Sequence, residues 1–128
     1  MSGETDLAKL LRAIEPVVRP GEFVFVSVDG PPDMYTLAMV DEEEGRTLVV
    51  TRGCADSRGW AYDYIAGWIT LRVQSSLAAV GLTAAVSKAL ADVGISCNVL
   101  AGYHHDHLLV PIERVDEAVT VLQQLAPV

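Results

Sequence analysis

Three histidines and an aspartate occur consecutively as His104, His105, Asp106 and His107. Imidazole and carboxylate groups are common ligands of zinc and other transition metals. In a strand, neighbouring side chains point to opposite faces. His105 and His107 would therefore lie on the same face. Two ligands need a further donor, and the chain contains no other histidine. We expect a polar hairpin turn or a pH-sensitive interface here, and a metal site through His105 and His107 is the minor alternative.

Hydroxyl groups gather in residues 75–83, where Ser75, Ser76 and Thr83 flank the start of a predicted helix. Free backbone N–H groups at a helix N-terminus, together with the positive end of the helix dipole, suit a carboxylate. Gly81 permits a close backbone approach to a ligand. The alternative is an ordinary capped helix start, in which the serines satisfy their own backbone groups.

Groups that suit an amine follow in residues 97–106. Asn98 and the pair Ala101-Gly102 can present amide and backbone groups to an α-amino group, and Asp106 can pair with an ammonium or another cation. Aspartate is equally common as a capping residue in turns, so this alternative stays open. The candidate ligand-binding residues are Ser75, Ser76, Val80, Gly81, Leu82, Thr83, Asn98, Ala101, Gly102 and Asp106.

The motifs of the common enzyme classes do not occur in this sequence. It contains no P-loop, no Gly-x-Gly-x-x-Gly after a strand and no Ser-His-Asp order that can be justified. A chain of 128 residues is also small for a closed catalytic cleft. We therefore expect no catalytic residues, no cofactor and no resident metal.

The elements that must position these residues form a strand, a helix, two strands and a helix. Residues 68–74 and 95–103 read as strands, and His107 begins a third strand that runs to residue 112. Between the first two, Leu82, Val86, Leu90 and Val93 recur at helical spacing, and Gly94 closes the helix. The remaining apolar positions, which mark the last helix, are Val115, Val119, Leu122 and Leu125. This order is typical of the split βαβ or ferredoxin-like class, which needs one more strand. Either the N-terminal half supplies it or the fold stops one strand short.

The sequence of the N-terminal half predicts a helix, a strand and a hairpin. Leu7, Leu10, Leu11 and Ile14 form an apolar helical stripe that Pro16 ends, and Pro20-Gly21 reads as a turn. Residues 23–28 read as a buried strand, and residues 35–40 and 46–51 as a hairpin with Gly45 in its loop. We place the boundary near Gly67 without a linker, giving an N-terminal half of residues 1–67 and a C-terminal half of residues 68–128 that pack as one body.

Composition limits the function classes. Apolar residues make up 51% of the chain and charged residues 20%, which supports a full core. The net charge of -8 disfavours nucleic acid and anionic membrane as partners, because both need a basic face. Cys54 and Cys97 form neither a metal motif nor a disulfide scaffold, and residues 1–6 lack the regions of a signal peptide. We expect a cytoplasmic protein.

Three runs carry a resemblance to a known family. They are Ser75-Ser-Leu-Ala-Ala-Val-Gly-Leu-Thr-Ala-Ala-Val86, Gly94-Ile-Ser-Cys-Asn-Val-Leu-Ala-Gly-Tyr103 and Asp106-His-Leu-Leu-Val-Pro111. Together they resemble the ACT-domain proteins, and more closely the small bacterial ACT-like proteins of similar length. The last run is also similar to the ACT modules of cytosolic arginine sensors, which carry an Asp-His-x-Leu-Val-Pro run. Upstream, Pro20-Gly-Glu-Phe-Val-Phe25 fits the bacterial group.

The resemblance implies an α+β fold of ferredoxin-like (ACT) βαββαβ type. Its antiparallel sheets would carry helices on one face, and two ACT-like halves would pack together. In ACT regulatory domains, the loop between the first strand and the first helix commonly binds an amino acid, and this loop corresponds to residues 75–83. In the arginine sensors the Asp-His-x-Leu-Val-Pro run lies beside the ligand pocket, which makes Asp106 the strongest single candidate.

Two hypotheses follow. In the first, the protein is a non-catalytic sensor that binds an amino acid between its two ACT-like halves. Residues 75–83 would take the carboxylate, Asn98, Gly102 and Asp106 would take the amine side, and the protein would be a homodimer. In the second, it is a ligand-free structural or interaction module that pairs with a separate enzyme, transporter or regulator. A cavity with convergent polar groups near Gly81 and Asp106 would favour the first.

Overall fold

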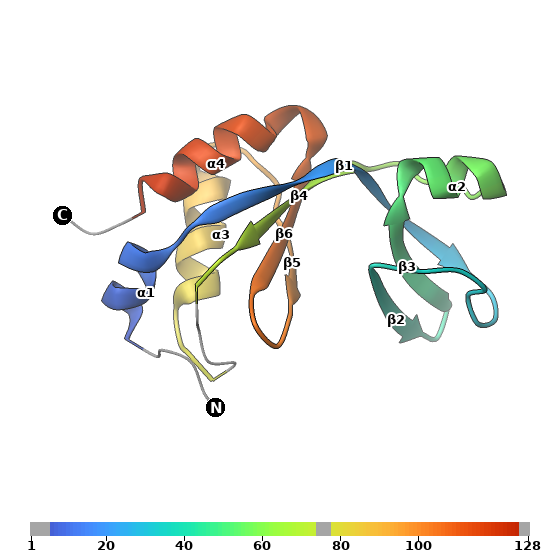
Figure 1. Cartoon of the computed structure of the whole chain (residues 1–128), viewed down its shortest axis with the longest axis horizontal. Helices are drawn as coiled ribbons and strands as arrows, with labels where there is room; N and C mark the ends of the chain where they lie inside the picture. Colours follow the sequence, from blue (N-terminus) through green and yellow to red (C-terminus); the bar gives the residue numbers. More distant parts are fainter. Residues whose placement is uncertain (1–5, 74–77, 126–128) are drawn as a thin grey trace. The chain divides into compact units, whose positions relative to one another are not determined.

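The computed structural model describes residues 6–73 and 78–125 of the chain (Figure 1). Their contacts divide the chain into two compact units, Met1–Pro20 with Gly67–Val128, and Gly21–Ala66. The predicted division into ACT-like halves of residues 1–67 and 68–128 stays a prediction. Among the described residues, no helix is both long and apolar enough to cross a membrane.

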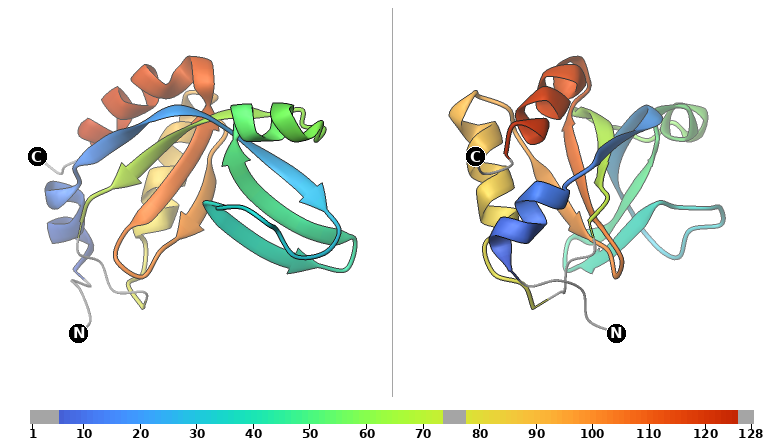
Figure 2. Two further views of the ribbon diagram at one scale, coloured as in Figure 1. Left: turned by 45° about the vertical axis from the view of Figure 1, so that its right-hand side comes forward. Right: turned by 60° about the vertical axis from the view of Figure 1, so that its left-hand side comes forward.

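The larger unit contains most of the helices. It holds α1 (Leu7–Ala13), the first part of β1 (Pro16–Val28), most of β4 (Ile65–Leu71), α3 (Leu82–Asp92), β5 (Asn98–Ala101), β6 (Asp106–Pro111), the short 3-10 helix η1 (Ile112–Arg114) and α4 (Val115–Gln123). The strand order in this unit is β1-β4-β6-β5. The helices lie on one face of these strands, as the two views of Figure 2 show.

The core of the larger unit forms between the helices and the sheet. Leu82, Val86 and Leu90 of α3 are buried, as the helical spacing predicts, and they pack in one cluster with Ala118 and Leu122 of α4. The strands contribute Ile69, Leu71, Leu108 and Val110 to the same cluster. Helix α3 ends where the sequence indicates, because Gly94 adopts a φ of +75° that favours glycine.

The strand that the ferredoxin-like pattern lacks comes from the N-terminal part of the chain. β1 is hydrogen-bonded to β4, at the position where the fold needs its remaining strand. The backbone N–H of Arg72 donates to the carbonyl oxygen of Glu15 at 2.9 Å and extends this pairing beyond β1. Of the two alternatives that the sequence left open, strand donation from the N-terminal half is therefore the correct one.

The smaller unit is a three-stranded sheet with one helix. Its strand order is β2-β3-β1, with β2 (Ala38–Glu42) and β3 (Gly45–Thr51) joined as the predicted antiparallel hairpin. α2 (Arg52–Arg58) begins at Thr51, whose hydroxyl accepts from the Cys54 N–H at 3.2 Å, and it ends at Gly59 with a φ of +68°. Val24, Val26, Leu48, Val50 and Ala55 form its core.

The structure confirms the α+β ferredoxin-like fold and corrects several element ends. The turn predicted at Pro20-Gly21 is wrong, because β1 runs without interruption from Pro16 to Val28. The strand predicted at residues 68–74 starts three residues earlier, at Ile65, and the strand predicted at residues 95–103 is only Asn98–Ala101. Within β1, Gly21 adopts a φ of +116°, a backbone conformation that glycine permits.

Candidate functional site

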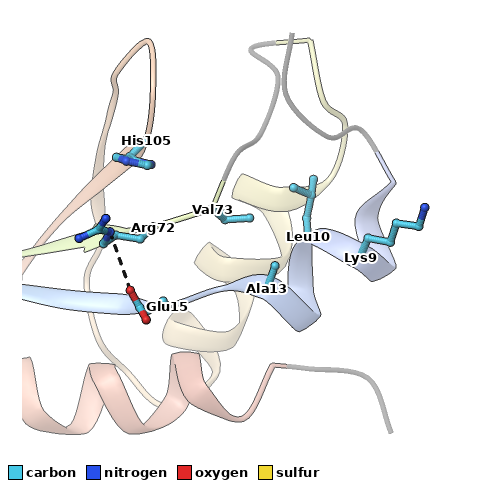
Figure 3. A pocket seen from close by; sticks show the side chains of 7 residues that line it. All are labelled: Lys9, Leu10, Ala13, Glu15, Arg72, Val73 and His105. Atoms are coloured by element: carbon cyan, nitrogen blue, oxygen red, sulfur yellow. Dashed lines mark ion pairs between the residues drawn. The ribbon is translucent and has the colours of Figure 1, made fainter. Parts of the chain in front are cut away.

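An open cavity lies at one end of the larger unit, where α1, β4 and the β5–β6 turn meet (Figure 3). Its volume is about 500 Å³, which is within the range of small-molecule sites. We call it the Arg72 cavity. Its lining residues are Lys9, Leu10, Ala13, Glu15, Arg72, Val73 and His105.

Helix α1 forms one wall of the Arg72 cavity because of how it is capped and packed. The Asp6 side chain accepts a hydrogen bond from the Lys9 N–H at 3.2 Å and so begins the helix. Leu10 is only 1% exposed and anchors α1 in the core of the larger unit. Lys9 and Ala13 are one helical turn apart, so that they share a face of α1.

The opposite wall carries two opposite charges. The Nε atom of Arg72 lies 3.8 Å from Oε1 of Glu15, and both side chains are more than half exposed. An exposed ion pair at this distance contributes little to stability, so a ligand can replace either partner at small cost. This wall of the cavity therefore offers a cationic group and an anionic group side by side.

His105 completes this wall from the β5–β6 turn. Its backbone oxygen accepts from the Gly102 N–H at 2.9 Å, which fixes the turn. Its Nδ1 atom is buried and has no hydrogen-bond partner among residues 6–73 and 78–125. A buried polar atom without a partner is uncommon in folded proteins.

The predicted residues Ala101, Gly102 and Asp106 come together in the same turn. Ala101 pairs with Asp106 across the hairpin. A Cβ atom at Gly102 would lie 2.7 Å from the backbone oxygen of His105 and 3.0 Å from Nε2 of His107, so the turn requires glycine. Burial raises the pKa of the half-buried Asp106 above its ordinary value, and the adjacent His107 lowers it by a smaller amount.

The predicted residues around the start of α3 differ from one another in how exposed they are. Gly81 is the N-cap, with a φ of +100° and no side-chain cap in the described part of the chain, and its Cα faces Leu7 of α1. Val80 is 83% exposed, and Thr83 is exposed too, whereas Leu82 is buried in the core. Ser75 and Ser76 lie outside the described residues.

The predicted residues of the β5–β6 turn and those at the start of α3 lie at the same end of the larger unit. The turn and the segment that enters α3 appear together in every view (Figures 1 and 2). Asn98 differs from them. It pairs with Leu109 at the far end of β5, three residues from Ala101 and thus about 10 Å along the strand. The structure therefore brings the turn residues close to the Arg72 cavity and leaves Asn98 away from the turn.

His107 lies among aromatic and polar side chains of β4. Its Nδ1 atom is 3.0 Å from Oγ1 of Thr70 and 3.3 Å from Nε1 of Trp68, and Arg19 stacks on the Trp68 ring at 5.2 Å. Burial lowers the pKa of His107 below its ordinary value, His105 lowers it further, and Asp106 acts in the opposite direction. Within residues 6–73 and 78–125, no three metal-binding side chains lie close enough to hold an ion, so the metal alternative gains no support.

Most residues of the Arg72 cavity were not among the sequence candidates. Lys9, Leu10, Ala13 and Glu15 belong to the N-terminal segment, and they meet Arg72 only because β1 lies beside β4. The one usable signal was the missing strand of the C-terminal half, which indicated that a distant segment must join this sheet.

Comparison with known proteins identifies the family. One ACT-domain model matches residues 2–67, and a second ACT-domain model matches residues 64–124. The chain therefore belongs to the ACT-domain family, as the sequence runs indicated. ACT domains are typically regulatory modules that bind small ligands such as amino acids. No curated protein matches the chain.

Solved structures agree with this assignment. A protein of unknown function from Vibrio cholerae, described as a possible transport protein, is 39% identical, with a TM-score of 0.86 over 94% of this chain and 96% of that one. A protein from Agrobacterium tumefaciens is 17% identical, with a TM-score of 0.67 over 88% and 89% of the two chains. The ligand-free regulatory subunit of aspartate kinase from Thermus thermophilus is 9% identical, with a TM-score of 0.62 over 90% and 99%. The last two likenesses concern the fold.

Proposed function

We propose that this protein is a non-catalytic regulatory protein that binds a free amino acid at the cavity end of its larger unit. Membership of the ACT-domain family supports a small-ligand regulatory role. The observation that carries the amino-acid proposal is the Arg72 cavity, in which a guanidinium and a carboxylate lie 3.8 Å apart beside an apolar wall. A zwitterion presents the complementary pair of charges.

The proposed roles follow the chemistry of each group. Residues 75–83, which lead into α3 at its N-cap Gly81, take the ligand carboxylate together with Arg72. Gly102 and Asp106 take the amine side, with Glu15 as a second anionic partner. Asn98, at the far end of β5, is left out of this proposal. The half-buried position of Asp106 favours this role, because an ammonium would relieve the unfavourable burial of its charge.

In this proposal, ligand binding changes how copies of the protein associate. A ligand that prefers one of two arrangements of the protein shifts the population toward it. The strand edges of β2 and β5, which end the strand orders of the two units, suit a homodimer, and we propose this state in the cytoplasm. No nucleic acid or membrane partner is proposed, given the net charge of -8.

Thermal unfolding in the presence of each common amino acid tests the proposal. At about 100 times its Kd a ligand adds roughly 2.7 kcal/mol of stability. For a domain of this size we expect Tm to rise by about 5 to 15 °C with at least one amino acid. A flat response to the whole set would contradict amino-acid binding and favour the ligand-free interaction module.

Asp106→Asn provides the sharpest variant for the amine side. We expect at least about tenfold weaker binding, because a charged hydrogen bond is lost. Without ligand, the variant should be slightly more stable than the wild type at pH 6. The pKa of Asp106 is raised in the folded state, so the wild type loses stability as pH rises through that pKa, and asparagine does not.

The pH dependence of the Tm difference separates the loss of the Asp106 charge from a general change of the fold. The Tm difference between Asp106→Asn and the wild type should be small near pH 4 and grow towards pH 6. Asp92→Asn is a matched control, since Asp92 is exposed on α3 and pairs with Lys88 at 2.9 Å. Unchanged binding in Asp106→Asn would remove this residue from the site.

A further inference from the structure

The exposed side chains that line the Arg72 cavity are mostly charged. These exposed residues are Lys9, Ala13, Glu15 and Arg72. The apolar lining residues Leu10 and Val73 are only 1% and 6% exposed, because they belong to the core cluster of the larger unit. They present too little surface to recognise a ligand side chain, so the charged groups must select it.

Two cationic residues and one anionic residue share this lining. In Figure 3, Arg72 and Glu15 lie on one side and Lys9 lies on the other, with Ala13 between them. The guanidinium of Arg72 suits the α-carboxylate of an amino acid, and the carboxylate of Glu15 suits its α-ammonium. A ligand held in this way can extend its side chain over Ala13 towards Lys9.

Lys9 is the lining cation that has no ion pair in the described part of the chain. Its side chain extends outward from α1 in Figure 3, and its flexible four-carbon stem lets the ammonium turn towards an anion bound over Ala13. The lining thus has one more cationic than anionic group, although the whole chain has a net charge of -8. The group that complements this lining is a second carboxylate on the ligand.

We infer that the Arg72 cavity takes an amino acid with an acidic side chain, L-aspartate or L-glutamate. This inference rests on the proposed function and names its ligand class. The α-carboxylate pairs with Arg72, the α-ammonium with Glu15, and the side-chain carboxylate with Lys9. A ligand with a cationic side chain would instead bring like charges together at Lys9, which is unfavourable.

Isothermal titration calorimetry of the full chain at neutral pH with matched ligands tests the inference. L-Aspartate and L-asparagine have nearly the same shape, as do L-glutamate and L-glutamine, but only the acids carry a second carboxylate. We expect the tighter-binding acid to exceed its amide at least about tenfold in affinity, because hydrogen bonds between charged groups are the stronger ones. The diacid without the ammonium, succinate for aspartate or glutarate for glutamate, should also bind at least about tenfold more weakly.

Lys9→Gln locates the side-chain carboxylate. Affinity for the tighter-binding acid should fall about threefold to tenfold, as expected for an exposed charge pair, whereas affinity for the matching amide should stay within about twofold. Lys88→Gln is the matched control, because it makes the same change of charge on α3, where Lys88 is exposed and pairs with Asp92. It should leave both affinities unchanged.

The outcomes separate the inference from the proposed function. If an amide, a basic or an apolar amino acid binds as tightly as the acids, the protein still binds amino acids but the inference is wrong. If the diacid without the ammonium binds equally well, or if Lys9→Gln behaves like Lys88→Gln, the assigned pairing is absent and the inference is also wrong. If no amino acid binds, both fall together.

Discussion

Gly67→Ala is expected to be strongly destabilising. A Cβ atom at Gly67 would lie 2.1 Å from Cγ2 of Val115, and also 3.4 Å from Cδ1 of Ile112, at the place where α4 crosses β4. Such overlap forces backbone or side-chain shifts that typically cost about 1–3 kcal/mol, and we expect the upper end of this range or more. The corresponding drop in Tm is on the order of 10 °C, which differential scanning calorimetry would measure.

Two further variants make the Gly67 prediction specific. Gly53→Ala is the control, since no atom of the described residues lies within 4 Å of its added Cβ in α2, and alanine in a helix should raise stability by about 0.5–1 kcal/mol. Val115→Ala removes the methyl group that the new Cβ meets, so it should rescue Gly67→Ala in part. A Gly67→Ala protein as stable as the wild type would show that α4 does not pack against β4 in this way.

Arg72→Gln is expected to remove most of the response to amino acids while leaving the fold intact. The guanidinium of Arg72 lines the cavity beside Glu15, and a hydrogen bond to a charged group contributes about 1.5–3 kcal/mol. Affinity for the amino acid that gives the largest Tm shift should therefore fall roughly tenfold to a hundredfold. Stability without ligand should change little, because the pair with Glu15 is exposed.

The control for Arg72→Gln must change the net charge equally without touching the cavity. Lys88→Gln does so, since Lys88 is exposed on α3 and pairs with Asp92 in the same unit. We expect this variant to bind as the wild type does. Equal losses of affinity in the two variants would mean that long-range charge, and not contact with Arg72, governs binding.

Much of the fold could be predicted because local chemistry and tertiary packing agree. The apolar spacing of Leu82, Val86 and Leu90 predicted α3, and these side chains are buried in the core. Gly45 predicted the hairpin of the smaller unit, where its φ is +152° and an added Cβ would lie 2.7 Å from Oγ of Ser27. In both places one residue type suits the local backbone and its neighbours at once.

Only residues 23–28 of the long strand β1 were predicted, because the local signals before them indicate a break. Pro16 and Pro20 remove backbone donors, and Gly21 is a common turn residue. In the structure Pro16 is the first residue of β1, a position that tolerates proline, and pairing with neighbouring strands keeps the chain extended through Gly21. Tertiary pairing therefore overrode turn chemistry.

Only part of the candidate site could be predicted from the sequence, for the same reason. Ala101, Gly102 and Asp106 could be found because the turn that holds them is local in sequence. The wall of the Arg72 cavity that α1 supplies could not be found, because it requires β1 to lie beside β4. No local pattern records which distant segment completes a sheet.

The most direct test of the central claim is to map amide chemical shifts by NMR while the full chain is titrated with the amino acid that gives the largest Tm shift. We predict the strongest perturbations at Arg72, Val73 and His105 and around Gly81, all at the cavity end of the larger unit. Core amides of the smaller unit, such as those of Val24 and Leu48, should move little. Perturbations confined to the smaller unit, or absent at saturating ligand, would contradict the account.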